Sequence, residues 1–312
     1  MSVDFRKLKS FVKIVDAGSV SRASAILNIA QPALSQQIAG LEAHFGHKLL
    51  LRSNTGITPT EAGLILYRHA QLMLRQIDQA QIDMNLAAGS IAGRVSIGLA
   101  TYSTTSALSI PFLKEMRRRH PDIVVHVNDS FGHVLSELIM TGKMDMALIY
   151  GEGPIKGVTL QPLFREEMFL VSPAGLRFDA PDEAALPLAS LGGVDLLLPG
   201  RGHFLRQLIE ASFARARVTP KVAAEIESVS ALTAAVSGGL GSTILPASVA
   251  GVPAAGGAFV LRRLVRPAIE ATVSLCVSDH LPLSEPALAA RAVLLDTVHT
   301  AVRVETPGLR TA

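Results

Sequence analysis

The sequence lacks most features of secreted, membrane-bound or metal-based proteins. It contains no tryptophan and a single cysteine, Cys276, which excludes an intrachain disulfide and a cysteine-based metal cluster. No apolar run approaches the roughly 20 residues that span a bilayer, and the charged start MSVDFRKLKS does not resemble a signal peptide. Cys276 lies in the predicted strand TVSLCVSD, where we expect a buried, unreactive thiol. We therefore predict a cytoplasmic protein without a membrane partner, metal or cofactor.

The charge of the chain is unevenly distributed. Residues 1–60 hold seven Lys and Arg against three Asp and Glu, whereas the whole chain has a net charge of only +3. All the excess positive charge therefore lies in the first fifth of the chain. A basic module attached to a nearly neutral body is typical of proteins that bind polyanions. Chance clustering is the alternative that charge alone leaves open.

Three helices are predicted within the first 45 residues. Apolar residues at helical spacing predict the first over residues 4–17, and Ser19 can cap a second over 19–27. After a three-residue break, Pro32 suits the first position of a third helix, which ends at Gly46. Two helices joined by so short a turn, after a supporting helix, have the spacing of a helix-turn-helix.

A hairpin is predicted next, around the turn-rich tetrapeptide at residues 53–56, and one of its arms carries Arg52. A wing occupies this place in a winged helix-turn-helix. The segment TPTE then has capping-box spacing, with Thr58 as the cap and Pro59 at the first helical position. We predict a winged helix-turn-helix domain over residues 1–59.

A long helix is predicted over residues 60–88. Its apolar positions alternate in steps of four and three residues, which is a heptad seam. A seam of this length on a small domain predicts a homodimer, and packing of the helix on its own chain is the alternative. The seam residues are Leu66, Ala70, Met73, Ile77, Ala80, Met84 and Ala87.

Beyond a small-residue hinge at 89–93, apolar strands alternate with helices. This pattern predicts a parallel sheet with helices on both faces. It occurs twice, so we predict an α/β domain over 94–302 that is built from two subdomains with a cleft between them. Subdomain I comprises about 94–163 and 268–302, and subdomain II about 164–267. The tail RVETPGLRTA is predicted to be disordered.

Long stretches of the chain resemble the LysR-type transcriptional regulators. The N-terminal similarity covers FVKIVDAGSVSRASAILNIAQPALSQQIAGLEAHFGHKLLLRSNTGITPTEAG, and the later one includes IPFLKEMRRRHPDIVVHV, SELIMTGKMDMALIY and SALTAAVSGGLGSTILP. Within the family, IAQPALSQQ and AEIESVSALTAA are most similar to the nitrogen assimilation control subgroup. The resemblance implies a winged helix-turn-helix, a dimerising linker helix and a periplasmic-binding-protein-like effector domain. It also implies oligomers, usually tetramers, at interrupted palindromes in promoters, where they can contact RNA polymerase.

The outward face of the third helix is suited to the major groove of DNA. Leu34, Ile38, Leu41 and Phe45 form one apolar stripe, and small or polar residues occupy the other face. Glutamine can bond adenine bidentately, and an arginine on the wing can contact phosphate or the minor groove. A solvated surface is the alternative for a glutamine-rich helix taken alone. The candidate DNA-binding residues are Gln31, Pro32, Ser35, Gln36, Arg52 and Thr58.

Hydroxyl-rich segments follow the predicted strands of the second half. Ligands of α/β sheets bind at the carboxyl ends of strands, and hydroxyls, helix-end amides, one Arg and one His suit a small anion. These residues also suit simple helix caps and turns, and the bulky Tyr102 can partly fill the site. The candidate effector-binding residues, in part carried over from the family resemblance, are Thr101, Ser103, Thr104, Ser130, Arg201 and His203.

Three other functions account for less of the chain. The histidines do not fall at metal-ligand spacing, and no phosphate loop or nucleophile elbow occurs, which argues against an enzyme. A solute-binding protein of a transport system would not need the basic N-terminal module. A DNA-packing protein would not need an α/β cleft. We therefore expect a DNA-binding transcriptional regulator that responds to a small molecule, with a role in nitrogen metabolism as the narrower hypothesis.

Overall fold

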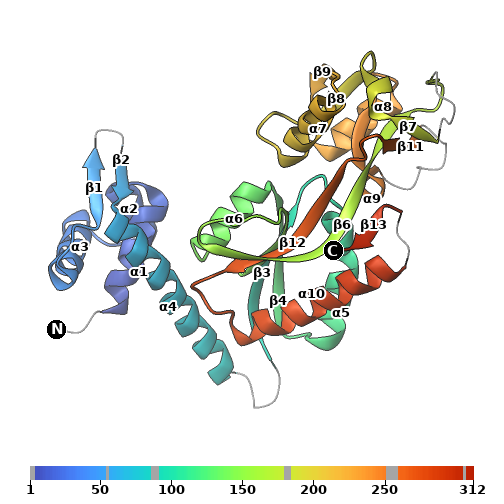
Figure 1. The fold of residues 1–312 in the computed structure, drawn as a ribbon. Helices are drawn as coiled ribbons and strands as arrows, with labels where there is room; N and C mark the ends of the chain where they lie inside the picture. Colours follow the sequence, from blue (N-terminus) through green and yellow to red (C-terminus); the bar gives the residue numbers. More distant parts are fainter. Residues whose placement is uncertain (1–3, 54–55, 86–90, 179–183, 251–258, 305–306) are drawn as a thin grey trace. The chain divides into compact units, whose positions relative to one another are not determined.

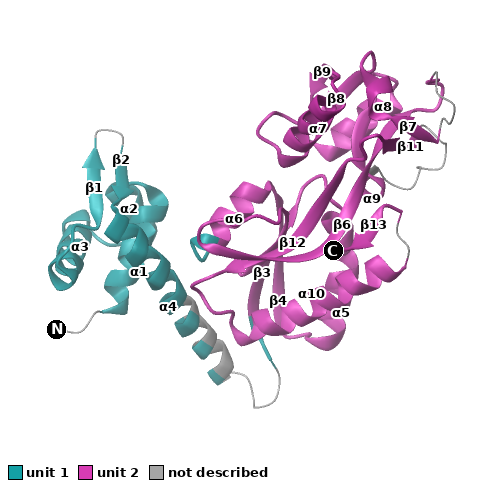
Figure 2. Ribbon diagram, viewed as in Figure 1, with its two compact units in different colours: residues 1–93, 140–143 teal, residues 94–139, 144–312 magenta. Residues whose placement is uncertain are grey.

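The structure, a computed structural model, divides into two units (Figure 2). The first comprises residues 1–93 and 140–143, and the second comprises residues 94–139 and 144–312. Within them the structure describes residues 4–53, 56–85, 91–178, 184–250, 259–304 and 307–312.

The first unit has three short helices, a hairpin and one long helix (Figure 1). As predicted, the side chain of Ser19 caps the second helix by accepting a hydrogen bond from Arg22 N–H. The turn after it is held by Asn28 in the left-handed conformation and by Ser24 Oγ, which donates to Ile29 O over 2.6 Å. The elements are α1 (Phe5–Ala17), α2 (Val20–Leu27), α3 (Gln31–Phe45), β1 (Leu50–Ser53), β2 (Gly56–Pro59) and α4 (Glu61–Asn85).

Apolar residues from all three short helices meet the start of α4 in one core. The predicted stripe of α3 is confirmed at Leu34, Ile38 and Leu41 but is wrong at Phe45, which is 39% exposed because the helix ends there. Burial of this stripe fixes the opposite face of α3 toward solvent. The largest contributors to the core are Leu8, Phe11, Ile14, Leu34, Ile38, Leu41, Leu49, Leu66 and Tyr67.

The residue that caps α4 is Thr60, and the predicted cap at Thr58 is wrong. Thr58 and Pro59 belong to β2, where they pair with Leu51 and Leu50. The Thr60 hydroxyl accepts from Gly63 N–H over 2.9 Å and donates to Lys48 O over 2.6 Å. One side chain thus satisfies a free amide of the helix start and joins the helix to the segment that enters the wing.

The heptad seam of α4 serves two purposes. Its first positions, Leu66 and Ala70, lie in the core of the unit itself, and Met73 packs against that core. Farther along, Ile77 is 41% and Met84 is 82% exposed. Ala80 is also exposed, whereas Ala87 lies outside the described residues. Only the second half of the seam is therefore available to a second chain.

The second unit contains two lobes, the first of which we call lobe I. Its sheet has the order β4-β3-β5-β12-β6. The predicted all-parallel sheet is wrong, because β3 and β5 run parallel while β12 is antiparallel to both of its neighbours. The elements are β3 (Gly93–Ala100), η1 (Thr104–Leu108), α5 (Ser109–Arg119), β4 (Ile123–Ser130), α6 (Gly132–Met140), β5 (Met146–Tyr150), β12 (Glu270–Ser278) and α10 (Glu285–Arg303), together with the first half of β6 (Val158–Pro173).

The second half of β6 belongs to lobe II, where it pairs with β10 and β11. A separate parallel pair, β8 and β9, completes this lobe beside α7. The elements are β7 (Ala185–Pro187), η2 (Leu188–Leu191), β8 (Asp195–Leu198), α7 (Phe204–Arg215), β9 (Lys221–Glu225), α8 (Val229–Ser237), β10 (Thr243–Pro246), α9 (Ala247–Ala250) and β11 (Phe259–Val265). The chain passes between the lobes within β6 and again between β11 and β12 (Figure 1). The predicted domain limits stay predictions.

The predicted disorder of the tail is wrong in its last residues. Residues Leu309–Thr311 form β13, which pairs antiparallel with Phe164–Glu166 of β6. Gly308 O accepts from Glu167 N–H over 2.8 Å, and Arg310 forms ion pairs with Glu167 and Glu270. This strand is too short to be recognised from its own residues, since its partner lies about 145 positions earlier along the chain.

Two observations concern the described part of the chain as a whole. None of its helices has the length and apolar character needed to cross a membrane. Within the same residues no three His, Cys, Asp or Glu side chains are grouped so that they could hold a metal ion. Cys276 is fully buried in β12, as predicted, and burial raises the pKa of its thiol to about 12.

Candidate DNA interface and effector cleft

The outward face of α3 has the composition that the sequence predicts. Gln31, Pro32 and Gln36 are exposed, and Ser35 is partly exposed. Ala39, one turn beyond Ser35, is exposed as well. Small side chains on this face permit close approach to the floor of a groove, and the glutamine amides supply both donors and acceptors.

The wing contacts this face directly. Arg52 Nη2, on β1, donates to Ser35 Oγ, on α3, over 3.4 Å. The structure thus brings together two of the candidate DNA-binding residues from different elements. The guanidinium of Arg52 remains exposed, so it can also meet a phosphate.

Glu42 fixes the position of the wing relative to α3. Its carboxylate accepts from Lys48 Nζ over 2.8 Å and from Leu49 N–H over 3.0 Å. Burial alone would raise the pKa of Glu42, but the hydrogen bonds from Lys48 and Leu49 outweigh burial and lower it. The sequence reasoning did not identify Glu42, although an acidic residue facing a predicted basic wing is a usable signal.

Thr58 occupies a different place from the other candidates. It is exposed on β2 opposite Leu51, whereas Arg52 pairs with Ile57. Because side chains alternate along a strand, Thr58 and Arg52 lie on opposite faces of the hairpin. The structure therefore does not group Thr58 with Ser35 and Arg52.

In the second unit, Thr101 and His203 meet between the two lobes. Thr101 Oγ1, just after β3, lies 3.1 Å from His203 Nε2 at the start of α7. Leu205 N–H donates to His203 Nδ1 over 3.0 Å, so the neutral ring carries its proton on Nε2 and donates to Thr101. Burial, reinforced by the charge of nearby His133, lowers the pKa of His203 to about 4. At neutral pH the His203 ring is therefore uncharged.

Ser103 and Thr104 bind a buried carboxylate instead of facing an open site. Ser103 Oγ donates to Glu166 over 2.8 Å, and Thr104 N–H donates to its other oxygen over 3.0 Å. Thr104 Oγ1 lies 2.6 Å from Ser248 Oγ, which comes from α9 of lobe II. Burial raises the pKa of Glu166 even though these groups and Tyr150 hydrogen-bond to it. Glu166 could not be recognised from the sequence, because the groups that hold its carboxylate, Ser103 and Thr104, lie about 60 positions away along the chain.

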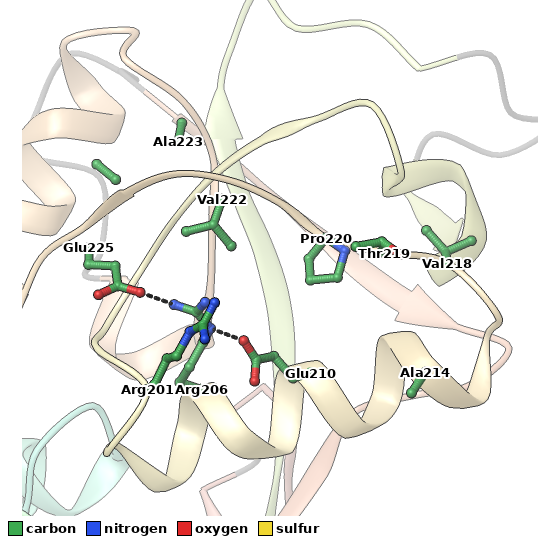
Figure 3. Close-up of a pocket in the computed structure, with 11 residues that line it drawn as sticks. Arg201, Arg206, Glu210, Ala214, Val218, Thr219, Pro220, Val222, Ala223 and Glu225 are labelled. Carbon is green, nitrogen blue, oxygen red and sulfur yellow. Dashed lines mark hydrogen bonds and ion pairs between the residues drawn. The ribbon is translucent and has the colours of Figure 1, made fainter.

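The remaining effector candidates lie elsewhere. Ser130 is partly exposed and contributes its backbone carbonyl to Thr101 N–H over 3.1 Å. Arg201 lines a groove of about 640 Å³ between α7 and β9, together with Arg206, Glu210 and Glu225 (Figure 3). Arg206 is buried there and paired with both glutamates. His203 does not line that groove, so the grouping of Arg201 with His203 in one anion site stays a prediction.

Comparisons with known proteins agree with both units. Residues 5–64 match the helix-turn-helix of the LysR family of bacterial regulatory proteins, and residues 88–298 match the LysR substrate binding domain. The chain is a LysR-type transcriptional regulator. Membership sets aside the enzyme, transport and DNA-packing hypotheses, because it accounts for both the basic module and the α/β domain.

Two curated relatives of this LysR-type regulator cover almost the whole chain. One is the nitrogen assimilation regulatory protein nac of Klebsiella aerogenes, 39% identical over 296 residues, with 95% of each chain covered. The other is the protein of the same name from Escherichia coli K12, 37% identical over 300 residues, with 96% of this chain and 97% of the relative covered.

Solved structures share the fold. A full-length OxyR variant from Pseudomonas aeruginosa superposes with a TM-score of 0.70 at 24% identity, covering 96% of this chain and 95% of OxyR. Full-length CbnR in complex with its target DNA gives a TM-score of 0.61 at 23% identity, covering 96% of this chain and 99% of CbnR. The winged helix-turn-helix and the periplasmic-binding-protein-like effector domain are thereby established as the fold of this LysR-type regulator.

Proposed function

We propose that this LysR-type regulator binds an interrupted palindrome in a promoter by placing α3 in the major groove. The observation that carries the proposal is the exposed face of Gln31, Ser35 and Gln36, held against Arg52 of the wing. Gln36 bonds base edges, Ser35 and Gln31 bond bases or phosphates, and Arg52 contacts phosphate or the minor groove. Pro32 fixes the start of the helix, and Thr58 is a peripheral phosphate contact.

Footprinting of the chain on a promoter fragment tests this proposal, with fragments chosen by mapping its bound sites across a genome. Gln36→Ala should lower the preference for the cognate site about ten- to hundredfold while leaving weak, salt-sensitive binding. Gln76→Ala, an exposed glutamine on α4, is the matched control and should bind like the wild type. An unchanged footprint for Gln36→Ala would remove α3 from base recognition.

The regulator acts as an oligomer in this proposal. The exposed second half of the α4 seam, at Ile77, Ala80 and Met84, supports a homodimer. A homotetramer needs a second interface, and lobe I presents exposed apolar residues at Ile110 of α5 and Val124 of β4. The assembly would act in the cytoplasm on DNA and contact RNA polymerase.

A small molecule in the cleft between the lobes is the proposed signal. Thr101 and His203 come from different lobes, and a ligand that bonds both would stabilise one arrangement of the lobes. The expected preference for anions loses support, because Arg201 lines another groove and burial lowers the pKa of His203 to about 4, which leaves that ring uncharged at neutral pH.

A thermal-shift screen tests the signal. It should include uncharged and cationic metabolites as well as anions, and stabilisation by a hit should disappear in Thr101→Val. Since the two nac relatives are named for nitrogen assimilation, compounds of nitrogen metabolism come first in the screen. If no compound stabilises the wild type, the small-molecule signal is refuted.

A further inference from the structure

Tyr102 is the most unusual residue of the second unit. Its side chain is only 1% exposed, although it follows a strand end that sequence reasoning places at the mouth of a cleft. Its backbone has φ +58°, in the left-handed region that large side chains rarely adopt. Glycine would take this conformation without strain, so the contacts of the tyrosine side chain must offset the strain.

Those contacts join the two lobes. Tyr102 OH donates to Ile226 O, between β9 and α8 of lobe II, over 2.8 Å. The ring meets the imidazole of His203 edge-on, with centroids 4.8 Å apart and an interplanar angle of 80°. On the lobe I side, Tyr150 OH donates to Tyr102 O over 2.9 Å. Tyr102 is thus fixed by its backbone in one lobe and by its ring and hydroxyl in the other.

The position of the ring is also that of the candidate effector site. Thr101, the preceding residue, contacts His203, and His203 in turn contacts the Tyr102 ring. Phe131, after β4, lies on another edge of the same imidazole, with centroids 5.2 Å apart. Thr101, Tyr102 and Phe131 therefore all contact the imidazole of His203, and the chain's own phenol covers one side of this candidate site.

We propose that Tyr102 is a built-in occupant of the effector cleft. Its ring takes the place of a small aromatic ligand, and its hydrogen bond to Ile226 holds the lobes together. A metabolite that binds at Thr101 and His203 competes with this ring. The occupancy itself stands on the contacts above, whereas its consequence for transcription rests on the proposed function.

Tyr102→Gly with added p-cresol tests the occupancy. Glycine relieves the backbone strain and vacates a space that matches the lost side chain, and p-cresol is that side chain as a free molecule. At a concentration about a hundredfold above its Kd, p-cresol should raise the melting temperature of Tyr102→Gly by about 5 to 10 °C. The wild type should not respond, because its site is filled.

Two control variants separate positioning from simple cavity filling. Tyr102→Phe keeps the ring and removes only the hydroxyl that bonds Ile226, so it should fold, reject p-cresol and hold the lobes less tightly. Phe213→Ala removes a fully buried aromatic side chain within lobe II alone. It can bind p-cresol in its cavity without any change between the lobes.

The distance between the lobes supplies the deciding measurement. Spin labels on Lys114→Cys in α5 and Ala211→Cys in α7 are both exposed, and buried Cys276 should stay unlabelled. With labelled chain co-assembled into an excess of unlabelled chain, Tyr102→Gly should broaden the distance distribution and p-cresol should restore it. Phe213→Ala should leave the distribution unchanged.

Three results would overturn the proposal. The first is a rise in the melting temperature of the wild type with p-cresol, and the second is no rise for a folded Tyr102→Gly variant. The third is a distance distribution between the lobes that is the same in the wild type, Tyr102→Gly and Tyr102→Phe. In cells that carry Tyr102→Gly, p-cresol should change expression from a promoter reporter by several-fold. Since the stability and distance measurements contain no DNA, a failure of promoter binding alone would refute the proposed function and leave the occupancy standing.

Discussion

Gly63 of α4 lies directly against the carbonyl of Leu49, at the entrance to the wing. A Cβ added to Gly63 would be 2.0 Å from Leu49 O and 3.2 Å from Pro59 Cβ. Helix and wing approach so closely only because this position has no side chain. The glycine of the TPTEAG motif thus has a packing role, next to the Thr60 cap.

Gly63→Ala should destabilise the first unit by about 2 kcal/mol or more, because backbone must move to admit the methyl group. Chemical unfolding followed by circular dichroism measures the loss. Gly153→Ala is the matched control, since a Cβ there meets nothing within 4 Å. Equal stability of the two variants would contradict the close packing of α4 on the wing.

Arg52→Ala should weaken promoter binding about equally for cognate and unrelated DNA. Loss of one phosphate contact should also lower the slope of log K against log salt by about 1. Binding titrations over a range of salt concentrations measure both effects. Arg117→Ala, an exposed arginine of α5, should change neither, and an unaltered slope for Arg52→Ala would exclude Arg52 from the DNA contact.

The double variant Ile77→Glu, Met84→Glu should give folded monomers in sedimentation experiments. Both side chains are exposed, so the charges disrupt a partner interface without entering the core of the unit. Leu66→Glu should unfold the unit instead, because Leu66 is buried in that core. Gln76→Glu is the control for added charge on α4, and dimers that persist in the double variant would refute the seam.

His203 should make the second unit less stable as the pH falls. Its pKa is about 4 in the fold against 6.5 ordinarily, so below pH 6.5 the unfolded chain binds a proton that the folded chain does not. The stability that neutral His203 contributes is therefore fully present above pH 6.5. As the pH falls toward 4, the free energy of unfolding decreases by up to about 1.4 kcal/mol per pH unit.

His203→Asn isolates this effect, because asparagine can still accept from Leu205 N–H but does not titrate. Urea unfolding between pH 7 and pH 4.5 should show a smaller loss of stability for the variant than for the wild type. The raised pKa of Glu166 has the opposite effect, since it makes the fold more stable as the pH falls. This effect is the same in the wild type and in the variant, so it cancels in the comparison. His126→Asn, at an exposed histidine, should behave like the wild type.

Local chemistry explains what could be predicted from the sequence. Ser19 and Gly46 mark helix ends through their own cap and backbone preference, and they do so in the structure as well. Pro32 marks the start of α3 to within one residue, because the helix begins at Gln31 and Pro32 takes its second position and not the predicted first one. The apolar spacing of Leu34, Ile38 and Leu41 likewise fixes which face of α3 is exposed. These features depend on residues within one or two helical turns of each other.

The features that could not be predicted depend on contacts outside the local segment. TPTE contains two threonines that could cap a helix. Because Thr58 and Pro59 pair with Leu51 and Leu50 in the hairpin, the helix begins after them and Thr60 is the cap. Glu166 is held by Ser103 and Thr104, about 60 positions earlier along the chain, and β13 forms only because β6 offers it an edge.

The pairing of β13 with β6 affects how this regulator can be followed in cells. A fluorescent protein or degradation tag fused after Ala312 would be attached one residue from a strand that pairs beside Glu166, where the chain passes from one lobe to the other. Such a fusion would disturb the connection between the lobes that it is meant to report on. The open surroundings of Gly153 make that loop a safer place for a label.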